Sequence, residues 1–261
     1  MGPFPDHYLE QPHSLDVSDK GWVCVVDRGG RRLSLGAADE NPVSFPLGFR
    51  ATRCRFVGAN VALLGDDGLL ATLAPDGAPV GETRVRDGAV NLAVSRGGSV
   101  FVSYSRRGSQ DHGVTLERLG ATPLQYTDPA ILDGHCLAVE SGALWLAGTG
   151  SESPSARAVR LRPTAGGLSC TQTVGLPTPP RAAAVGPDGA MWVVLEPGET
   201  ITRVFKDRAE APQRLPEPAS ELVRQGKRLF SCGPRGWCDL THLVPRPDGS
   251  FPEPDLPGCS T

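Results

Sequence analysis

The stretch GPDGAMWVV (186–194) decides the fold of this chain. A tight polar turn with Gly189 runs directly into small apolar and aromatic residues, which is the pattern of one β-hairpin arm. Five other stretches repeat it, each a turn with glycine followed by a β-branched or small apolar run. They are SDKGWVCVV (18–26), FVGANVALL (56–64), SRGGSVFVS (95–103), ESGALWLAG (140–148) and RQGKRLFSC (224–232). This recurrence predicts an internal repeat of one structural unit.

The glycines of these turns give the length of the unit. They are Gly21, Gly58, Gly98, Gly142, Gly189 and Gly226, so successive spacings are 37, 40, 44, 47 and 37 residues. An apolar stretch precedes each turn, a third stretch usually follows the hairpin, and a proline-rich fourth stretch closes most units. Four short strands in about 40 residues, repeated six times, indicate an all-β fold, a six-bladed β-propeller with four antiparallel strands per blade.

The repeat predicts a single propeller domain over residues 1–261. We expect blades at about 13–50, 51–88, 89–134, 135–179, 180–219 and 220–261, with residues 1–12 helping to close the ring. The sequence leaves open whether PFPDHYLE near the N-terminus or SFPEPDLP near the C-terminus completes a shared blade. Because one blade cannot bury its faces alone, we expect Phe101, Trp145 and Trp192 to pack between neighbouring blades. The inserts RRGSQDHG and GTGSESPSAR are expected as loops on one face of the ring.

Composition excludes several classes of protein. The net charge is −3 and the sequence has no basic run. The clustered positive charge that is typical of nucleic-acid-binding proteins is therefore absent. No apolar stretch approaches 18 residues, and the N-terminal residues lack the pattern of a signal peptide, which predicts a cytoplasmic protein outside the membrane. The seven cysteines are odd in number and widely spaced, which favours reduced thiols. Abundant Ala, Gly, Pro and Arg are typical of a GC-rich bacterial genome.

The segment PPRAAAVGPDGAMWVV (179–194) resembles the inner-strand motif of the propeller superfamily that contains virginiamycin B lyase, NHL-repeat proteins and the senescence marker protein/gluconolactonase family. Resemblance to the gluconolactonases implies metal ligands near Glu10 and Asn91. The next asparagine position holds Gly134 or His135, however, and the catalytic aspartate position holds Arg181. The paired histidines and glutamates of virginiamycin B lyase have no match after MWVV or LWLA. We therefore expect no catalytic residues, no metal and no cofactor.

A ligand site is predicted at the mouth of the central channel, where the inner strands begin. Alignment on the turn glycines gives polar residues ahead of mostly apolar strands in all six units, and they are His13, Arg53, Asn91, His135, Arg181 and Glu221. The alternative is that a wet channel mouth needs polar residues without any ligand. If the six do form a site, two arginines against one glutamate favour a small anion, or an acidic side chain of a partner, over a cation.

Two functional hypotheses remain open at this stage. The first is a non-catalytic scaffold that presents loops and a channel mouth to a protein partner. The alternative is a lactonase-like or lyase-like enzyme, or a small-anion receptor, that uses the channel mouth. A further open point is SCGPRGWC (231–238), in which Cys232 and Cys238 are two hairpin thiols, a cross-strand disulfide or half of a zinc site.

Overall fold

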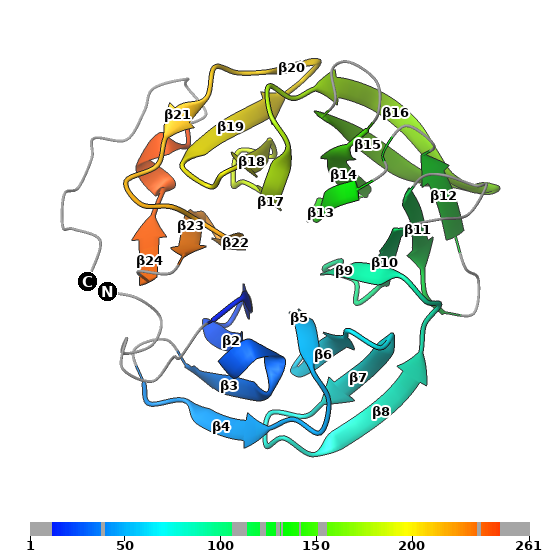
Figure 1. Ribbon diagram of the computed structural model, residues 1–261, viewed down its shortest axis with the longest axis vertical. Coiled ribbons are helices and arrows are strands. Elements are labelled where there is room, and N and C mark those ends of the chain that lie inside the picture. Colours follow the sequence, from blue (N-terminus) through cyan, green and yellow to red (C-terminus); the bar gives the residue numbers. More distant parts are fainter. Residues whose placement is uncertain are drawn as a thin grey trace.

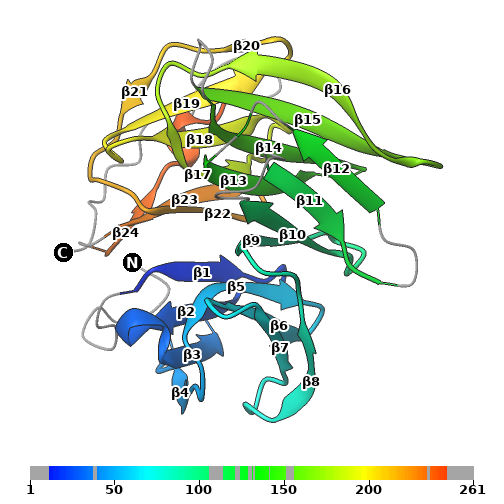
Figure 2. The ribbon, with the colours of Figure 1, turned by 45° about the vertical axis from the view of Figure 1, so that its right-hand side comes forward.

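Six antiparallel sheets stand around a central axis in the computed structural model (Figure 1), and Figure 2 shows the same arrangement turned by 45°. The structure describes residues 12–37, 40–105, 114–120, 124–128, 131, 133–140, 142–150, 156–233 and 236–245. The six-bladed propeller predicted from the repeat is therefore confirmed. The predicted loop RRGSQDHG, residues 151–155 of the second insert and both candidate closing segments lie outside the described residues.

The first three blades each contain four strands, which follow one another from the axis outward. The strands of the first blade are β1 (Ser14–Val17), β2 (Trp22–Asp27), β3 (Arg32–Ala37) and β4 (Val43–Pro46). Those of the second blade are β5 (Ala51–Val57), β6 (Asn60–Gly65), β7 (Leu69–Leu73) and β8 (Pro79–Arg84). Those of the third blade are β9 (Ala89–Val94), β10 (Val100–Ser105), β11 (Val114–Arg118) and β12 (Leu124–Asp128).

The last three blades vary in their outer strands. The fourth blade has β13 (Asp133–Glu140), β14 (Ala143–Thr149), β15 (Ala156–Thr164) and β16 (Gly167–Gly175). The fifth has β17 (Pro180–Val185), β18 (Met191–Leu195), β19 (Thr200–Phe205) and a divided outer position formed by β20 (Arg208–Ala209) and β21 (Gln213–Arg214). The described part of the sixth has β22 (Glu221–Gln225), β23 (Arg228–Gly233) and β24 (Gly236–Asp239).

Two short 3-10 helices complete the described chain, η2 (Arg28–Gly30) between β2 and β3, and η3 (Thr241–Leu243) after β24. In the part of the chain that the structure describes, neither helix has the length or apolar character to cross a lipid bilayer.

The repeated glycines work as the turn residues between the first and second strands. All six have positive φ, from 55° at Gly226 to 82° at Gly21. This left-handed backbone costs an L-residue with a Cβ atom but not glycine, so the spacing of glycines in the sequence reports the spacing of the turns.

Each second strand is buried on both faces, which explains why its sequence is mostly apolar. In β2, Val23 and Val25 pack in a cluster with Val223 of the sixth blade, whereas Cys24 and Val26 pack in a cluster with the second blade. Side chains alternate between the two faces of a strand, so a strand between two neighbouring blades has no polar side. Burial between blades therefore replaces the single central core of most domains.

One apolar cluster lies at each of the six blade interfaces. Phe101 is in the cluster between the third and fourth blades, Trp145 in the one between the fourth and fifth, and Trp192 in the one between the fifth and sixth. These three aromatic side chains are 4%, 3% and 1% exposed. The prediction that they pack between blades is confirmed.

The inner strands line a channel with two different ends. At the entry end, each inner strand begins after the connection from the preceding blade. At the turn end, each inner strand leads through its glycine turn into the second strand (Figure 1). The inner strands contact their neighbours around the axis, and contact between β1 and β22 closes the ring.

Candidate functional site

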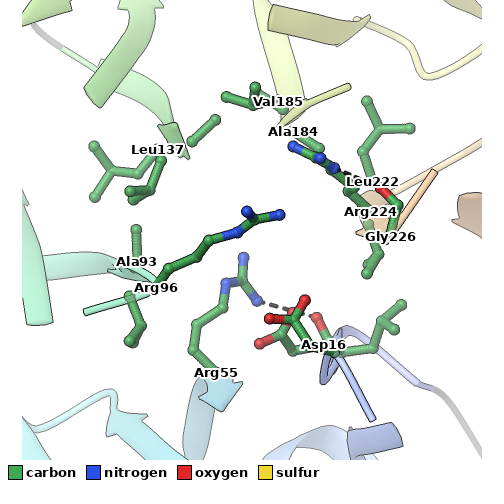
Figure 3. Close-up of a pocket in the computed structure, with 17 residues that line it drawn as sticks. Asp16, Arg55, Ala93, Arg96, Leu137, Ala184, Val185, Leu222, Arg224 and Gly226 are labelled. Atoms are coloured by element: carbon green, nitrogen blue, oxygen red, sulfur yellow. Dashed lines mark hydrogen bonds between the residues drawn. The ribbon is translucent and has the colours of Figure 1, made fainter. Parts of the chain in front are cut away.

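A pocket opens at the turn end of the channel, and all six blades contribute to its wall. Its volume is about 180 Å³. Most of the residues that line it are apolar, such as Ala93, Leu137, Ala184 and Leu222, but polar atoms provide most of its exposed surface. The charged residues of the lining belong to four blades, and they are Asp16, Asp19, Arg55, Arg96 and Arg224. Figure 3 shows the side chains of the three arginines converging on the middle of the pocket from β5, from the turn after β9 and from β22.

Arg55 is the deepest of these groups, and it joins three blades. Its Nη1 donates to the backbone oxygens of Cys54 at 2.7 Å and Leu15 at 3.1 Å. Its Nη2 lies 3.4 Å from Oε1 of Glu221, which is itself only 7% exposed. Glu221 and Asp16 raise the pKa of Arg55 above its ordinary value, against the opposing effect of burial. This arginine is charged and its charge is already matched within the protein.

Asp16 faces Arg55 from the first blade. Its Oδ2 accepts a hydrogen bond of 2.8 Å from the backbone N–H of Phe56. Burial is the main cause that raises the pKa of Asp16, and it outweighs the Arg55 charge and the backbone hydrogen bonds. Asp16 therefore connects the first blade to the second, with a carboxylate that the channel only partly stabilises.

Arg96 and Arg224 lie nearer the opening, on blades that are opposite one another in a ring of six. The Nε of Arg224 donates to the backbone oxygen of Gly226 at 2.8 Å, which leaves the end of its guanidinium group toward the pocket. Burial and then repulsion by Arg96 lower the pKa of Arg224, and Asp19 and Asp188 oppose this shift. Arg96 is exposed, and among the described residues it forms no ion pair with a carboxylate.

The residues predicted at the entry end make separate local contacts. Arg53 Nε donates to Oδ1 of Asn91 at 3.3 Å, so the structure brings these two together from neighbouring blades. A ring nitrogen of His13, Nε2, lies 3.0 Å from the backbone oxygen of Ala51.

The other three predicted residues lie in their expected inner strands. Glu221 bonds to Arg55 of the second blade. Arg181 is bonded within its own blade, to the backbone oxygen of Pro197 at 3.0 Å and to Glu196 at 3.5 Å. His135 belongs to β13, and its side chain is outside the described part. The described contacts thus join Arg53 with Asn91 but do not link the six into one network.

Sequence reasoning missed Arg55, Arg96 and Arg224 because it considered only the beginnings of the inner strands. A signal for two of them was available. Arg96 and Arg224 each lie two residues before a turn glycine, as does Asp19. The same position holds Glu140 in the fourth unit, whose side chain is outside the described part. Alignment at the turn, instead of at the strand start, would have placed these charged residues together at one end of the channel.

The thiols of the sixth blade face opposite sides of their sheet. Cys232 is opposite Trp237 in the strand register and Cys238 is opposite Ser231. Cys232 packs toward the first blade and Cys238 toward the fifth. A cross-strand disulfide or a shared zinc site is therefore excluded for this pair. Burial raises the pKa of Cys232 to about 12, so it is a neutral thiol. Within the described residues there is no group of three potential metal ligands.

Known structures share this architecture. A catalytically inactive virginiamycin B lyase from Staphylococcus aureus with quinupristin is 17% identical, with a TM-score of 0.63 over 88% of this chain and 80% of that one. Regucalcin from Agrobacterium tumefaciens, a calcium-binding protein, is 11% identical, with a TM-score of 0.64 over 87% and 83%. BBS1N in complex with ARL6DN is 16% identical, with a TM-score of 0.58 over 88% and 77%.

This chain is a six-bladed β-propeller. At such low identities the likeness extends to the fold alone, since unrelated functions share this architecture. No known family matches the sequence, and no curated protein is similar to it. Enzymes and a partner-binding propeller are both among the similar structures, so the choice between them rests on the chemistry of the channel.

Proposed function

We propose that the chain is a non-catalytic binding module that presents the turn end of its channel to a protein partner. The observation that carries this proposal is the pair Arg96 and Arg224, whose guanidinium groups converge on the pocket opening from opposite blades. Arginine offers a planar set of donors suited to carboxylates and is enriched at the centres of protein interfaces.

The surface beside this opening supports the same proposal. Trp22 follows the Asp19–Gly21 turn, its backbone N–H bonded to Oγ of Ser18, and its side chain is 41% exposed. An exposed tryptophan at the same end of the ring as the two arginines is typical of an interaction surface. Lys20 and Lys227, in the turns of the first and sixth blades, add positive charge to this end. We refer to Asp19, Trp22, Arg96 and Arg224 as the turn-end surface.

The charged groups inside the channel favour a structural role over catalysis. Arg55, Asp16 and Glu221 bond to one another or to the backbone of neighbouring blades. General acid–base catalysis needs a group that reaches the substrate and exchanges its proton near the working pH. The enzyme alternative, a lactonase-like or lyase-like activity at the entry end near Arg53 and Asn91, is favoured by the enzymes among the similar structures. The predicted site at the entry end stays a prediction.

Affinity purification with quantitative mass spectrometry tests the binding module. The variant Arg96→Ala/Arg224→Ala removes two charges from the turn-end surface. The matched control Arg84→Ala/Arg208→Ala removes two exposed charges from the outer strands β8 and β20. We expect at least one protein to be recovered equally by the wild type and the control but about ten-fold less by the Arg96/Arg224 variant, and to bind again when purified.

Two outcomes would overturn the proposal. One is that every protein recovered with the wild type is recovered equally with the Arg96/Arg224 variant. The other is turnover of lactone or streptogramin substrates by the purified wild type, lost on Arg53→Ala. That result would instead support the enzyme alternative at the entry end.

A further inference from the structure

Three guanidinium groups share one small pocket, which is an unusual concentration of like charge. Arg55 lies at the bottom, and Arg96 and Arg224 lie toward the opening (Figure 3). Arg55 has counter-charges within the wall, Glu221 at 3.4 Å and Asp16 beside it. The positive charge that faces the open part of the pocket therefore comes from Arg96 and Arg224.

Arg96 destabilises the charge of Arg224 at the opening. Burial and then repulsion by Arg96 lower the pKa of Arg224, and Asp19 and Asp188 act in the opposite direction. Asp188 is already bound to Arg203, at 2.7 Å. An anion between two converging guanidinium groups would remove this repulsion and gain charge-assisted hydrogen bonds from both.

The size of the pocket limits what it can hold. Its volume is about 180 Å³. Pockets for drug-sized ligands begin at about 300 Å³. A carboxylate or phosphate group with a short attached chain fits this space, and its charge would lie in a partly apolar wall where electrostatic attraction is strengthened.

We infer that the turn end of the channel is an anion-binding site, in which Arg96 and Arg224 hold one carboxylate or phosphate group above Arg55. The group can belong to a small free anion or to an acidic side chain of a partner. Only the second source rests on the proposed function. The site opens at the turn end of the channel, whereas the sequence predicted a site at the entry end. Glu221, one of the six predicted residues, contacts the turn-end site through Arg55.

Titration of the purified protein at low salt tests this inference. The probes are inorganic phosphate, for the free anion, and the blocked peptide acetyl-Gly-Glu-Gly-amide, for the acidic side chain. Acetyl-Gly-Gln-Gly-amide is the neutral control. We expect phosphate or the glutamate peptide to bind with a millimolar or lower Kd and the glutamine peptide not to bind. Two-dimensional NMR of the arginine side-chain N–H groups reports which arginines respond.

Variants assign the binding to particular side chains. Arg96→Ala or Arg224→Ala should weaken binding by about ten-fold, because each removes hydrogen bonds to a charged group. Asp19→Asn should strengthen binding several-fold, since it removes a carboxylate from the same pocket wall. Arg208→Ala, on the outer strand β20, should leave binding unchanged. Circular dichroism confirms that each variant keeps its β structure.

The possible outcomes separate this inference from the proposed function. The anion site would be overturned if neither anion binds at about 10 mM, which is above the expected Kd. It would also be overturned if Arg96→Ala and Arg224→Ala leave the binding intact. Partner capture that depends on these arginines would still support the binding module in that case. Phosphate binding without peptide binding would support a free anion as the ligand, and the reverse result an acidic side chain.

Discussion

Asp16 shows how burial in the channel affects the pKa of a single carboxyl group. Its Oδ2 is bonded to the backbone N–H of Phe56 at 2.8 Å, and Arg55 is its nearest counter-charge. Even so, burial raises its pKa above the ordinary value of 3.8. The folded protein therefore holds the proton of Asp16 more tightly than the unfolded chain does, and the charged form of this residue disfavours folding.

The pH dependence of stability should reveal this residue. Between the unfolded pKa near 3.8 and the raised folded pKa, the native state binds more protons than the unfolded state, so the Asp16 contribution lowers stability as pH rises. Asp16→Asn keeps an acceptor for Phe56 and removes this titration. We expect the stability of the variant relative to the wild type to increase from pH 4 to pH 7 in urea unfolding experiments. A difference that is constant with pH, or that falls as pH rises, would contradict the assignment.

At the scale of elements, the turn η2 shows how closely one blade approaches the next. Gly30 has a φ of 92°, and a Cβ atom there would lie 2.3 Å from the backbone oxygen of Ala51, the first residue of β5. Gly29 has a similar φ of 65°, but nothing lies within 4 Å of its Cβ position. Both glycines permit a left-handed backbone, and only Gly30 is also required by contact with the second blade.

The two glycines therefore form a matched pair of substitutions. Gly29→Ala should cost about 1–2 kcal/mol of unfolding free energy, from the left-handed backbone alone. Gly30→Ala should cost that amount plus a further 1–3 kcal/mol, because the inter-blade contact has to open. Urea unfolding of the two variants measures both values. Equal losses of unfolding free energy in the two variants would show that the turn can shift to accommodate the Cβ atom of residue 30 without disturbing the second blade.

The inner three strands of the blades were predictable from sequence, and the outer strands were less so. The turn glycines and the apolar second strands repeat because burial and positive φ constrain them in every blade. Outer strands lack this constraint: all six residues of β8 are exposed, and the outer position of the fifth blade is divided between β20 and β21. A strand without a buried face carries no alternating apolar pattern.

The charged pocket was harder to predict for a different reason. The six residues predicted at the entry end lie from five (Arg53, Glu221) to eight (His13, Arg181) residues before their turn glycines. At about 3.3 Å per residue, that range spans ~10 Å along the channel axis. Arg55 follows Arg53 on the same side of β5, two residues nearer the turn end. Position along the strand, rather than residue type, decides which charges meet.

At the scale of the whole molecule, the ring closes where the first and sixth blades meet. The apolar cluster at this interface contains Leu15, Val23 and Val25 from the first blade with Val223 and Cys232 from the sixth. Arg55 of the second blade crosses to it, bonding the backbone of Leu15 and the carboxylate of Glu221. The closing interface thus combines apolar packing with a partly buried ion pair that spans three blades.

A double-mutant cycle on Arg55 and Glu221 measures how much this ion pair contributes to ring closure. Glu221→Gln leaves the Arg55 guanidinium with Asp16 as its remaining close carboxylate, and Arg55→Met leaves Glu221, which is 7% exposed, without its ion pair. Removing one partner of a buried pair costs about 3–5 kcal/mol, whereas replacing both removes the unpaired charge as well. We therefore expect each single variant to lose about 3 kcal/mol at neutral pH and the double variant to lose less than the sum, with a coupling energy of at least about 1 kcal/mol. Additive losses would mean that the two charges act independently, and that the apolar cluster between the first and sixth blades closes the ring without help from Arg55.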